Sequence, residues 1–142
     1  MPSPDAANVL APPVPLVALA GWLVPGSGYW LLGQRTRAIV VGVSVILLFL
    51  LGILVAGVAV VEAPSLSGGG SLLARILQKP WFLGQVMAGP LGVVTAWIGE
   101  AVARDYPAAK ARLGEIGTLY TAVAGMLNLI AIIDSSHRAS SR

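Results

Sequence analysis

The stretch Ala38–Val61, AIVVGVSVILLFLLGILVAGVAVV, decides the fold class, because its 24 residues include no charged side chain. A helix rises about 1.5 Å per residue, so about 20 apolar residues cross about 30 Å of hydrocarbon. Ser44 is the only residue of this run with a polar side chain. This stretch therefore predicts a membrane-spanning helix.

Three further charge-free runs flank this stretch: Ala6–Gln34, Pro80–Gly99 and Ile116–Ile133. A water-soluble helical domain needs a polar stripe on every surface helix, so it could not accommodate four such runs. Strands of a membrane barrel would be about 10 residues long with alternating polarity, which these runs lack. The sequence therefore predicts an all-α, polytopic membrane protein with about four membrane helices.

The same runs divide the chain into three parts. A flexible N-terminal tail is expected at 1–12, a single helical membrane domain at 13–134 and a polar C-terminal tail at 135–142. Inside the membrane domain, segments are expected at about 13–34, 38–61, 80–103 and 115–134. A short amphipathic helix at about 71–79, which Ser71 can cap, is expected at the membrane interface.

Two of the four segments contain helix-breaking residues. Pro25–Gly28 interrupts the first segment, since proline removes a helix hydrogen bond and glycine relaxes the backbone. The freed backbone groups cannot face lipid. The first segment is therefore either a kinked span or a short helix with a re-entrant or interfacial corner. Gly89–Pro90 predicts a kink in the third segment.

Small residues fall on one face of each of the last two segments when they are placed at 100° per residue. In a bilayer such faces let helix backbones approach closely, which favours association. We expect these faces to pack against each other or against a partner chain. The packing residues are Gly84, Ala88, Gly92 and Ala96 in the third segment, and Gly117, Thr121, Ala124 and Asn128 in the fourth.

Asn128 has two interpretations, because it lies about 9 Å of helix rise inside Asp134 and hence within the hydrocarbon. It is either a ligand for a substrate or ion, or an interhelical hydrogen-bonding residue. We favour the second interpretation, since no charged residue shares its stripe.

The net charge of +3 would favour nucleic acid as a partner in a soluble protein. In a membrane protein it is better explained by loop arginines and lysines that orient the helices. The short loops around Arg35–Arg37 and Arg104–Arg112 share one side whether or not the first segment fully crosses. The positive-inside rule then places both loops in the cytoplasm. We expect the chain in the inner (plasma) membrane.

Residues that carry chemistry are sparse. The chain has no cysteine and one histidine, His137, in the polar tail, whereas a metal site needs several ligands. Glu100, Glu115 and Asp134 lie at expected helix ends, where carboxylates reach headgroup water. We therefore expect no catalytic, metal or cofactor site, and no enzymatic activity.

The motif WLVPGSGYWLLGQRTR at 22–37 resembles a corner found in uncharacterised families of small, mostly bacterial, multi-pass membrane proteins. These families are loosely similar to the two-transmembrane hairpin domain, and 115–134 resembles the closing helix of one of them. The resemblance implies a short first helix, a glycine-rich interfacial corner and a second helix, with no established activity. The matching corner residues are Pro25, Gly26, Gly28, Leu32 and Gly33.

Helix packing is thus the function that the sequence favours. We expect an accessory or scaffold subunit or a homo-oligomer, whose partners are the lipid bilayer and other membrane subunits or itself. The alternative is a small transporter or channel component that uses the broken first segment. A membrane enzyme ranks third, because no nucleophile, base or metal site can be named.

Overall fold

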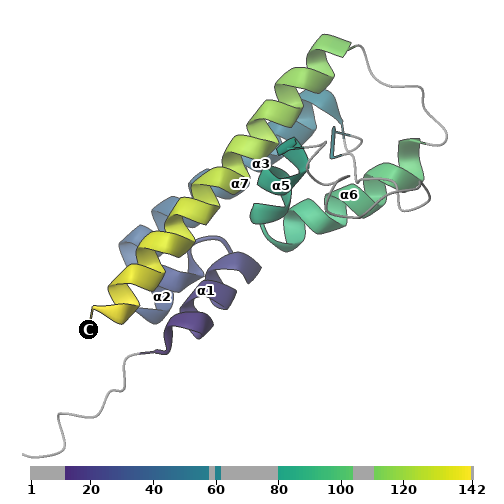
Figure 1. Cartoon of the computed structure of the whole chain (residues 1–142). Coiled ribbons are helices and arrows are strands. Elements are labelled where there is room, and N and C mark those ends of the chain that lie inside the picture. Colours follow the sequence, from purple (N-terminus) through teal and green to yellow (C-terminus); the bar gives the residue numbers. More distant parts are fainter. Residues whose placement is uncertain (1–11, 58–59, 62–79, 104–110, 142) are drawn as a thin grey trace, which may run out of the picture.

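The computed structural model describes residues 12–57, 60–61, 80–103 and 111–141, and every regular element in these ranges is a helix (Figure 1). The all-α class is therefore confirmed for this part of the chain. Residues 1–11 of the expected tail and the expected interfacial helix at 71–79 lie outside it. The helices are α1 (Val14–Leu23), α2 (Ser27–Leu31), α3 (Arg35–Ala56), α5 (Pro80–Met87), α6 (Pro90–Ala103) and α7 (Ala111–Ser140).

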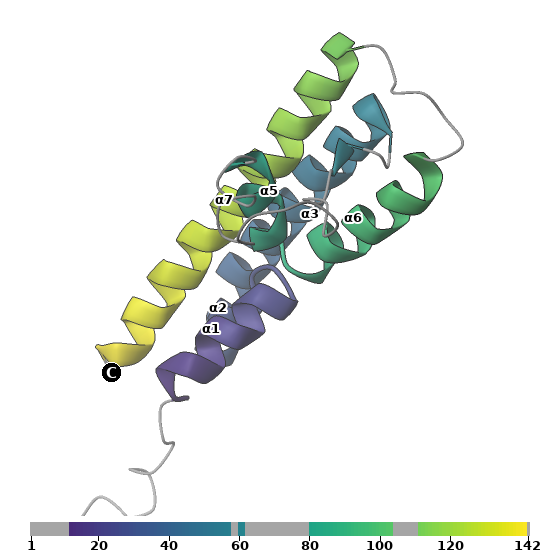
Figure 2. The same cartoon turned by 45° about the vertical axis from the view of Figure 1, so that its right-hand side comes forward.

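Two long helices, α3 and α7, form the axis of the molecule and lie side by side in Figures 1 and 2. They run antiparallel, because Gly52 near the end of α3 contacts Gly117 near the start of α7. Both are long and apolar enough to cross a membrane. Two such helices indicate a membrane protein, whereas the four spans expected from the sequence are not confirmed.

The first segment is broken into α1, of 10 residues, and α2, of 5 residues. Gly26 begins the second piece with a φ of +86°, which side chains with a Cβ rarely adopt. A Cβ at Gly26 would also collide with the carbonyl oxygen of Ala38. The chain therefore turns back at the corner, and α1 at about 15 Å is too short to cross a bilayer.

The third segment is also divided, and the break is sharper than the expected kink. Gly89 has a φ of +80° and separates α5 from α6, which diverges from the bundle in Figure 1. Pro90 is the first residue of α6, a position where its missing N–H costs no helix hydrogen bond. A positive φ followed by proline stops one helix and begins another, so the segment turns back instead of bending.

The fourth segment corrects the expectation of a polar tail at 135–142. Residues 135–140 continue α7, whose last residue is Ser140. Ser135 and Ala139 are buried, and Ala139 packs with Val17 of α1 and Leu32 beside α2. Packing by the first segment thus keeps these polar turns helical.

The second segment is shifted relative to the expected range 38–61. α3 begins at Arg35 and ends at Ala56, because Gly57 takes a φ of +80° while its N–H bonds to the carbonyl of Ile53. Val60 and Val61, beyond the helix, are buried in the core.

The core between α3 and α7 is a seam of mainly small residues spaced alternately three and four apart. This spacing lets side chains of one helix fit between those of its neighbour. At Gly117, an added Cβ would run into Ala56 and lie 2.6 Å from the carbonyl oxygen of Gly52. The buried residues with this spacing are Ala38, Gly42, Val45, Phe49, Gly52 and Ala56 on α3, and Gly117, Thr121, Ala124, Asn128, Ala131 and Ser135 on α7. Some of them also contact the broken segments: Gly42 lies against Pro25, Ser135 against Gly28, and Asn128 against the ends of α1 and α5.

The structure separates the two loops that the sequence placed on one side. Arg35 and Arg37 lie at the end where α7 finishes, since Tyr29, just before them, bonds to Asp134. α7 begins at the opposite end of the pair, so the chain enters it far from Arg35. The expectation that Arg35–Arg37 and Arg104–Arg112 share one side is therefore wrong for residues 111–112, which begin α7 at the opposite end. Residues 104–110 lie outside the described ranges. The reason is the break at Gly89, which turns the third segment back.

Candidate functional site

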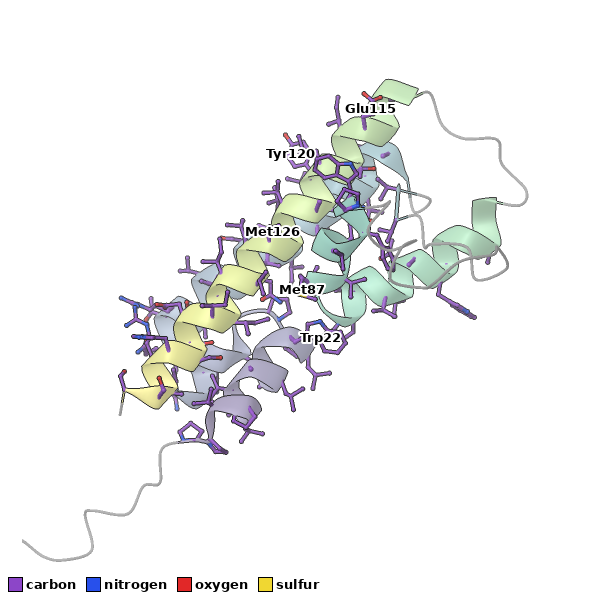
Figure 3. The ribbon with its side chains drawn as sticks, in the orientation of Figure 1. Trp22, Met87, Glu115, Tyr120 and Met126 are labelled. Atoms are coloured by element: carbon purple, nitrogen blue, oxygen red, sulfur yellow. The ribbon has the colours of Figure 1, made fainter. Side chains whose placement is uncertain are left out.

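The two broken segments meet where their first helices end. The indole Nε1 of Trp22, in α1, donates to the carbonyl of Val86, in α5, at 3.2 Å. Gly89 lies so close to the carbonyl of Trp22 that a Cβ there would overlap it. Figure 3 shows Trp22 and Met87 at the facing ends of α1 and α5. Both helices also pack on α7.

Asn128 of α7 occupies this meeting point. Its side chain is completely buried, and Nδ2 donates to the carbonyl of Gly21 at 3.2 Å and to that of Met87 at 2.9 Å. The last carbonyls of a helix have no partner within that helix, and leaving them buried without one is costly. One amide therefore joins the C-terminal ends of two short helices to the long helix beside them.

The other atom of this amide, Oδ1, is buried and has no hydrogen-bond partner among the described residues. Asn128 borders a small hollow between α7 and the corner, together with Gly21, Gly28, Tyr29 and Ser135. The hollow is too narrow to hold a water molecule. In this conformation, Asn128 contributes hydrogen bonds between helices and has no ligand space beside it.

Gln85 forms a second buried polar contact, between α5 and α7, that the sequence analysis missed. Its side chain is 2% exposed, and Nε2 donates to Thr121 Oγ1 at 2.8 Å and to the carbonyl of Val60 at 3.3 Å. A lone amide within a charge-free run was the available signal, because a bilayer offers it no other partner.

The small residues predicted to pack divide between two neighbours. Gly84 and Ala88 of α5 lie against Gly125 of α7, where a Cβ would overlap the Gly84 carbonyl. Gly117 contacts α3, whereas Thr121 contacts both neighbours, because it lies against Gly52 of α3 and its hydroxyl accepts a hydrogen bond from Gln85 of α5. Segments three and four thus meet through part of the predicted faces, and the rest packs on the second segment, whose small residues were overlooked.

The remaining predicted packing residues lie deeper in the molecule. Ala124 and Ala96 are buried in the main apolar cluster with Val45 and Phe49. Gly92 lies against the carbonyl of Gln85, so it allows α6 to fold back closely on α5. This last contact is local to the broken segment and joins no other helix.

The corner residues identified from the motif have distinct places. Pro25, Gly26, Gly28 and Leu32 are buried. A Cβ at Gly28 would come within 2.5 Å of Ser135 Oγ, so this glycine permits α2 to contact α7. Gly33 has a φ of +76° and nothing within 4 Å of its Cβ position, which makes it a turn residue only.

A polar cluster lies where α7 ends beside the corner. Tyr29 Oη donates to Asp134 Oδ2 at 2.8 Å, and Arg138 Nε donates to the same oxygen at 2.7 Å. Burial, together with the hydrogen bond to Asp134, raises the pKa of Tyr29 to about 12. Nearby, the guanidinium of Arg35 lies 5.8 Å from the centre of the Trp30 ring. None of these groups was predicted to form a site.

The sequence profile of a family described as of unknown function, DUF6677, matches residues 16–142. The chain belongs to this family. The DUF6677 match begins within α1 and covers both broken segments and both long helices, so it includes Asn128 and the corner. It confirms the expectation of an uncharacterised family, and it gives no support to the resemblance to the two-transmembrane hairpin domain.

No curated protein and no solved structure matches the chain significantly. Within the described residues, no three His, Cys, Asp or Glu side chains gather where they could hold a metal ion. What this DUF6677 chain can do is therefore argued from its helix contacts and its surface.

Proposed function

We propose that this chain is a small multi-pass protein of the inner (plasma) membrane that acts as an accessory or scaffold subunit. The supporting observation is the outward face of α6, where apolar side chains are exposed on a helix that leaves the bundle. Trp97 is 75% exposed and Val94 is 52% exposed. Among the described helices, the main contact of α6 is with α5.

The lengths of the helices support the membrane location. α3 and α7 are long enough to span, whereas α1 and α5 are about 15 and 12 Å long and lie end to end along α7. Together these two short helices match the thickness of the hydrocarbon core, about 30 Å. We infer that they enter from opposite sides of the membrane and jointly complete a third, discontinuous crossing.

The small-residue faces of α3, α5 and α7 are occupied within the chain, so a partner must use another surface. Burying leucine against leucine gains little in lipid, so membrane helices associate through small or polar residues, and this chain uses those of α3, α5 and α7 internally. The outward face of α6 remains, and its exposed tryptophan is of the type that dominates binding energy at interfaces. The partner is another membrane subunit or a second copy of the chain.

Purification in mild detergent, followed by mass spectrometry and measurement of the mass of the complex, tests this proposal. The wild-type chain should elute as an assembly, and the variant Val94→Ala/Trp97→Ala should lose it. Leu54→Ala is the matched control, because Leu54 is 80% exposed on α3. A wild-type chain that is monomeric, or a variant that assembles normally, would contradict the proposal.

A second candidate, a small transporter or channel component, is favoured by the meeting of the two broken segments at Asn128. In secondary transporters, paired discontinuous helices meet near the middle of the bilayer and form the binding site there. Here each broken segment precedes one long helix, and the two long helices are antiparallel. The halves α1–α3 and α5–α7 thus have the same order of elements and opposite directions, and they meet at Asn128.

Liposomes that contain the purified chain and a sodium-sensitive dye test this second candidate. Wild-type liposomes should take up sodium faster than empty ones, and Asn128→Leu should abolish the difference. Uptake equal to that of empty liposomes would eliminate the candidate, while the scaffold proposal would be unaffected.

A further inference from the structure

Three arginines gather at one end of the long helices. Arg35 and Arg37 lie in the first turn of α3, and Arg138 lies in the last turns of α7, which finish at the same end because the helices are antiparallel. Among the described residues, Asp134 is the single carboxylate at this end. Within the described ranges, three guanidinium groups therefore share this end with one carboxylate, and only Arg138 pairs with it, so the excess charge here is positive.

Asp134 positions the guanidinium of Arg138. Its Oδ2 accepts hydrogen bonds from both Arg138 Nε and Tyr29 Oη. The Arg138 side chain remains 37% exposed, and Arg37 lies at the same end, in the first turn of α3. A tyrosine fixed in the corner therefore orients a carboxylate, which in turn holds an arginine beside the first turn of α3.

The depth of this cluster follows from the apolar runs on either side. The charge-free part of α3 begins at Ala38 and that of α7 ends at Ile133. Arg35 and Arg37 thus lie within one turn of the hydrocarbon boundary, and Arg138 lies about 7.5 Å beyond it, at the level of the lipid headgroups. Trp30, 53% exposed and beside Arg35, is the kind of residue enriched at this level.

We propose that this end binds the phosphate headgroup of an anionic phospholipid, held between Arg37 and Arg138 with Arg35 at the side. Guanidinium groups pair with phosphate through two parallel hydrogen bonds, and basic clusters at helix ends bind anionic headgroups in this way. The proposal rests on the membrane location and is independent of the scaffold role. A lipid is the expected source of the phosphate because the cluster faces the headgroup layer.

The test measures the thermal stability of the detergent-purified full chain while phosphatidylglycerol or phosphatidylcholine is added. Phosphatidylglycerol should raise the unfolding temperature of the wild type more than phosphatidylcholine does. Arg37→Gln/Arg138→Gln should remove this preference, and Arg37→Lys/Arg138→Lys should keep part of it. If Arg138→Gln prevents folding, the single variant Arg37→Gln carries the test.

Arg112→Gln is the matched control for Arg37→Gln, because it removes one positive charge from the first turn of α7 at the opposite end. It should keep the preference for phosphatidylglycerol, and inorganic phosphate should not replace the lipid. The proposal is overturned if Arg112→Gln loses as much as the double variant, if the double variant keeps the full preference, or if phosphate alone stabilises equally. Extraction of native membranes with alkaline carbonate tests the membrane location separately. A chain that stays in the membrane fraction but shows no preference for phosphatidylglycerol refutes the lipid-binding proposal alone.

Discussion

At the scale of single residues, polar side chains inside the bundle bond to carbonyls that the broken helices leave free. Asn128 bonds to the ends of α1 and α5, and Gln85 connects α5 to Thr121 and Val60. The position of Asn128 on a small-residue stripe could be predicted from helical periodicity. Its partners could not, because Gly21 and Met87 are far from it in sequence and come together only in the fold.

Replacing Asn128 with leucine, which has the same branched shape but no hydrogen-bonding group, should lower the free energy of unfolding by about 0.6–2 kcal/mol, the range typical of interhelical hydrogen bonds in membranes. The loss arises because the carbonyls of Gly21 and Met87 keep no side-chain donor. Unfolding of the purified chain by titration with sodium dodecyl sulfate measures it. Ser44→Ala, on the exposed face of α3, should change stability little; equal effects would contradict the role of Asn128.

Tyr29 should give stability a specific pH dependence. Its pKa of about 12 in the folded chain exceeds the ordinary value of about 10, so folding favours the protonated phenol. This contribution is fully present below about pH 10 and is lost as the pH rises towards 12. Thermal unfolding across this window should show a falling stability that Tyr29→Phe flattens and the control Tyr120→Phe retains. If stability falls equally with pH in Tyr29→Phe, a group other than Tyr29 causes the pH dependence.

At the scale of elements, breaks matter as much as helices. The sequence located both breaks, since Pro25–Gly28 and Gly89–Pro90 stand within apolar runs. It did not show that the pieces fold back, because that depends on whether another helix covers the freed backbone. Gly26 contacts the backbone of Ala38 in α3, and Gly89 contacts the backbone of Trp22 in α1. These contacts form only when the helices have packed together.

Alanine at Gly26 or Gly89 should therefore destabilise the chain more than alanine at Gly33. All three residues have a positive φ, which costs a residue with a Cβ about 1–2 kcal/mol. Gly33 has open space around its Cβ position, whereas at the other two sites the Cβ meets a backbone carbonyl. The difference in unfolding temperature between Gly33→Ala and either of the other two variants measures the cost of the steric overlap alone. Three equal losses would show that the corner and the α5–α6 turn are not closely packed.

At the scale of the whole molecule, the fold determines which ends of the chain share a side. Counting the charge-free runs predicts four spans, with Arg35 and the start of α7 on the same side of the membrane. The structure places Arg35 beside the end of α7 instead, as the bond between Tyr29 and Asp134 requires. The two short helices that meet at Asn128 are the cause, because each turns back before reaching the other end.

Labelling of single cysteines with a membrane-impermeant maleimide tests this arrangement, and the chain is suited to it because it contains no cysteine. Thr36→Cys and Ser141→Cys should be labelled from the same side of sealed vesicles. Glu115→Cys, at the other end of α7 in Figure 3, should be labelled from the opposite side. Labelling of Thr36→Cys and Glu115→Cys from one side would restore the four-span arrangement.

By itself, the amino-acid sequence determined that this protein is helical, where its apolar runs lie and where glycine and proline interrupt them, because these properties follow from local composition and spacing. Only the tertiary structure decided that α7 extends through 135–140 and that α3 supplies half of the small-residue seam. Those outcomes depend on contacts such as Gly52 with Gly117 and Ala139 with Leu32, between residues far apart in the chain. No local pattern contains them, since a helix face is buried or exposed according to what packs on it.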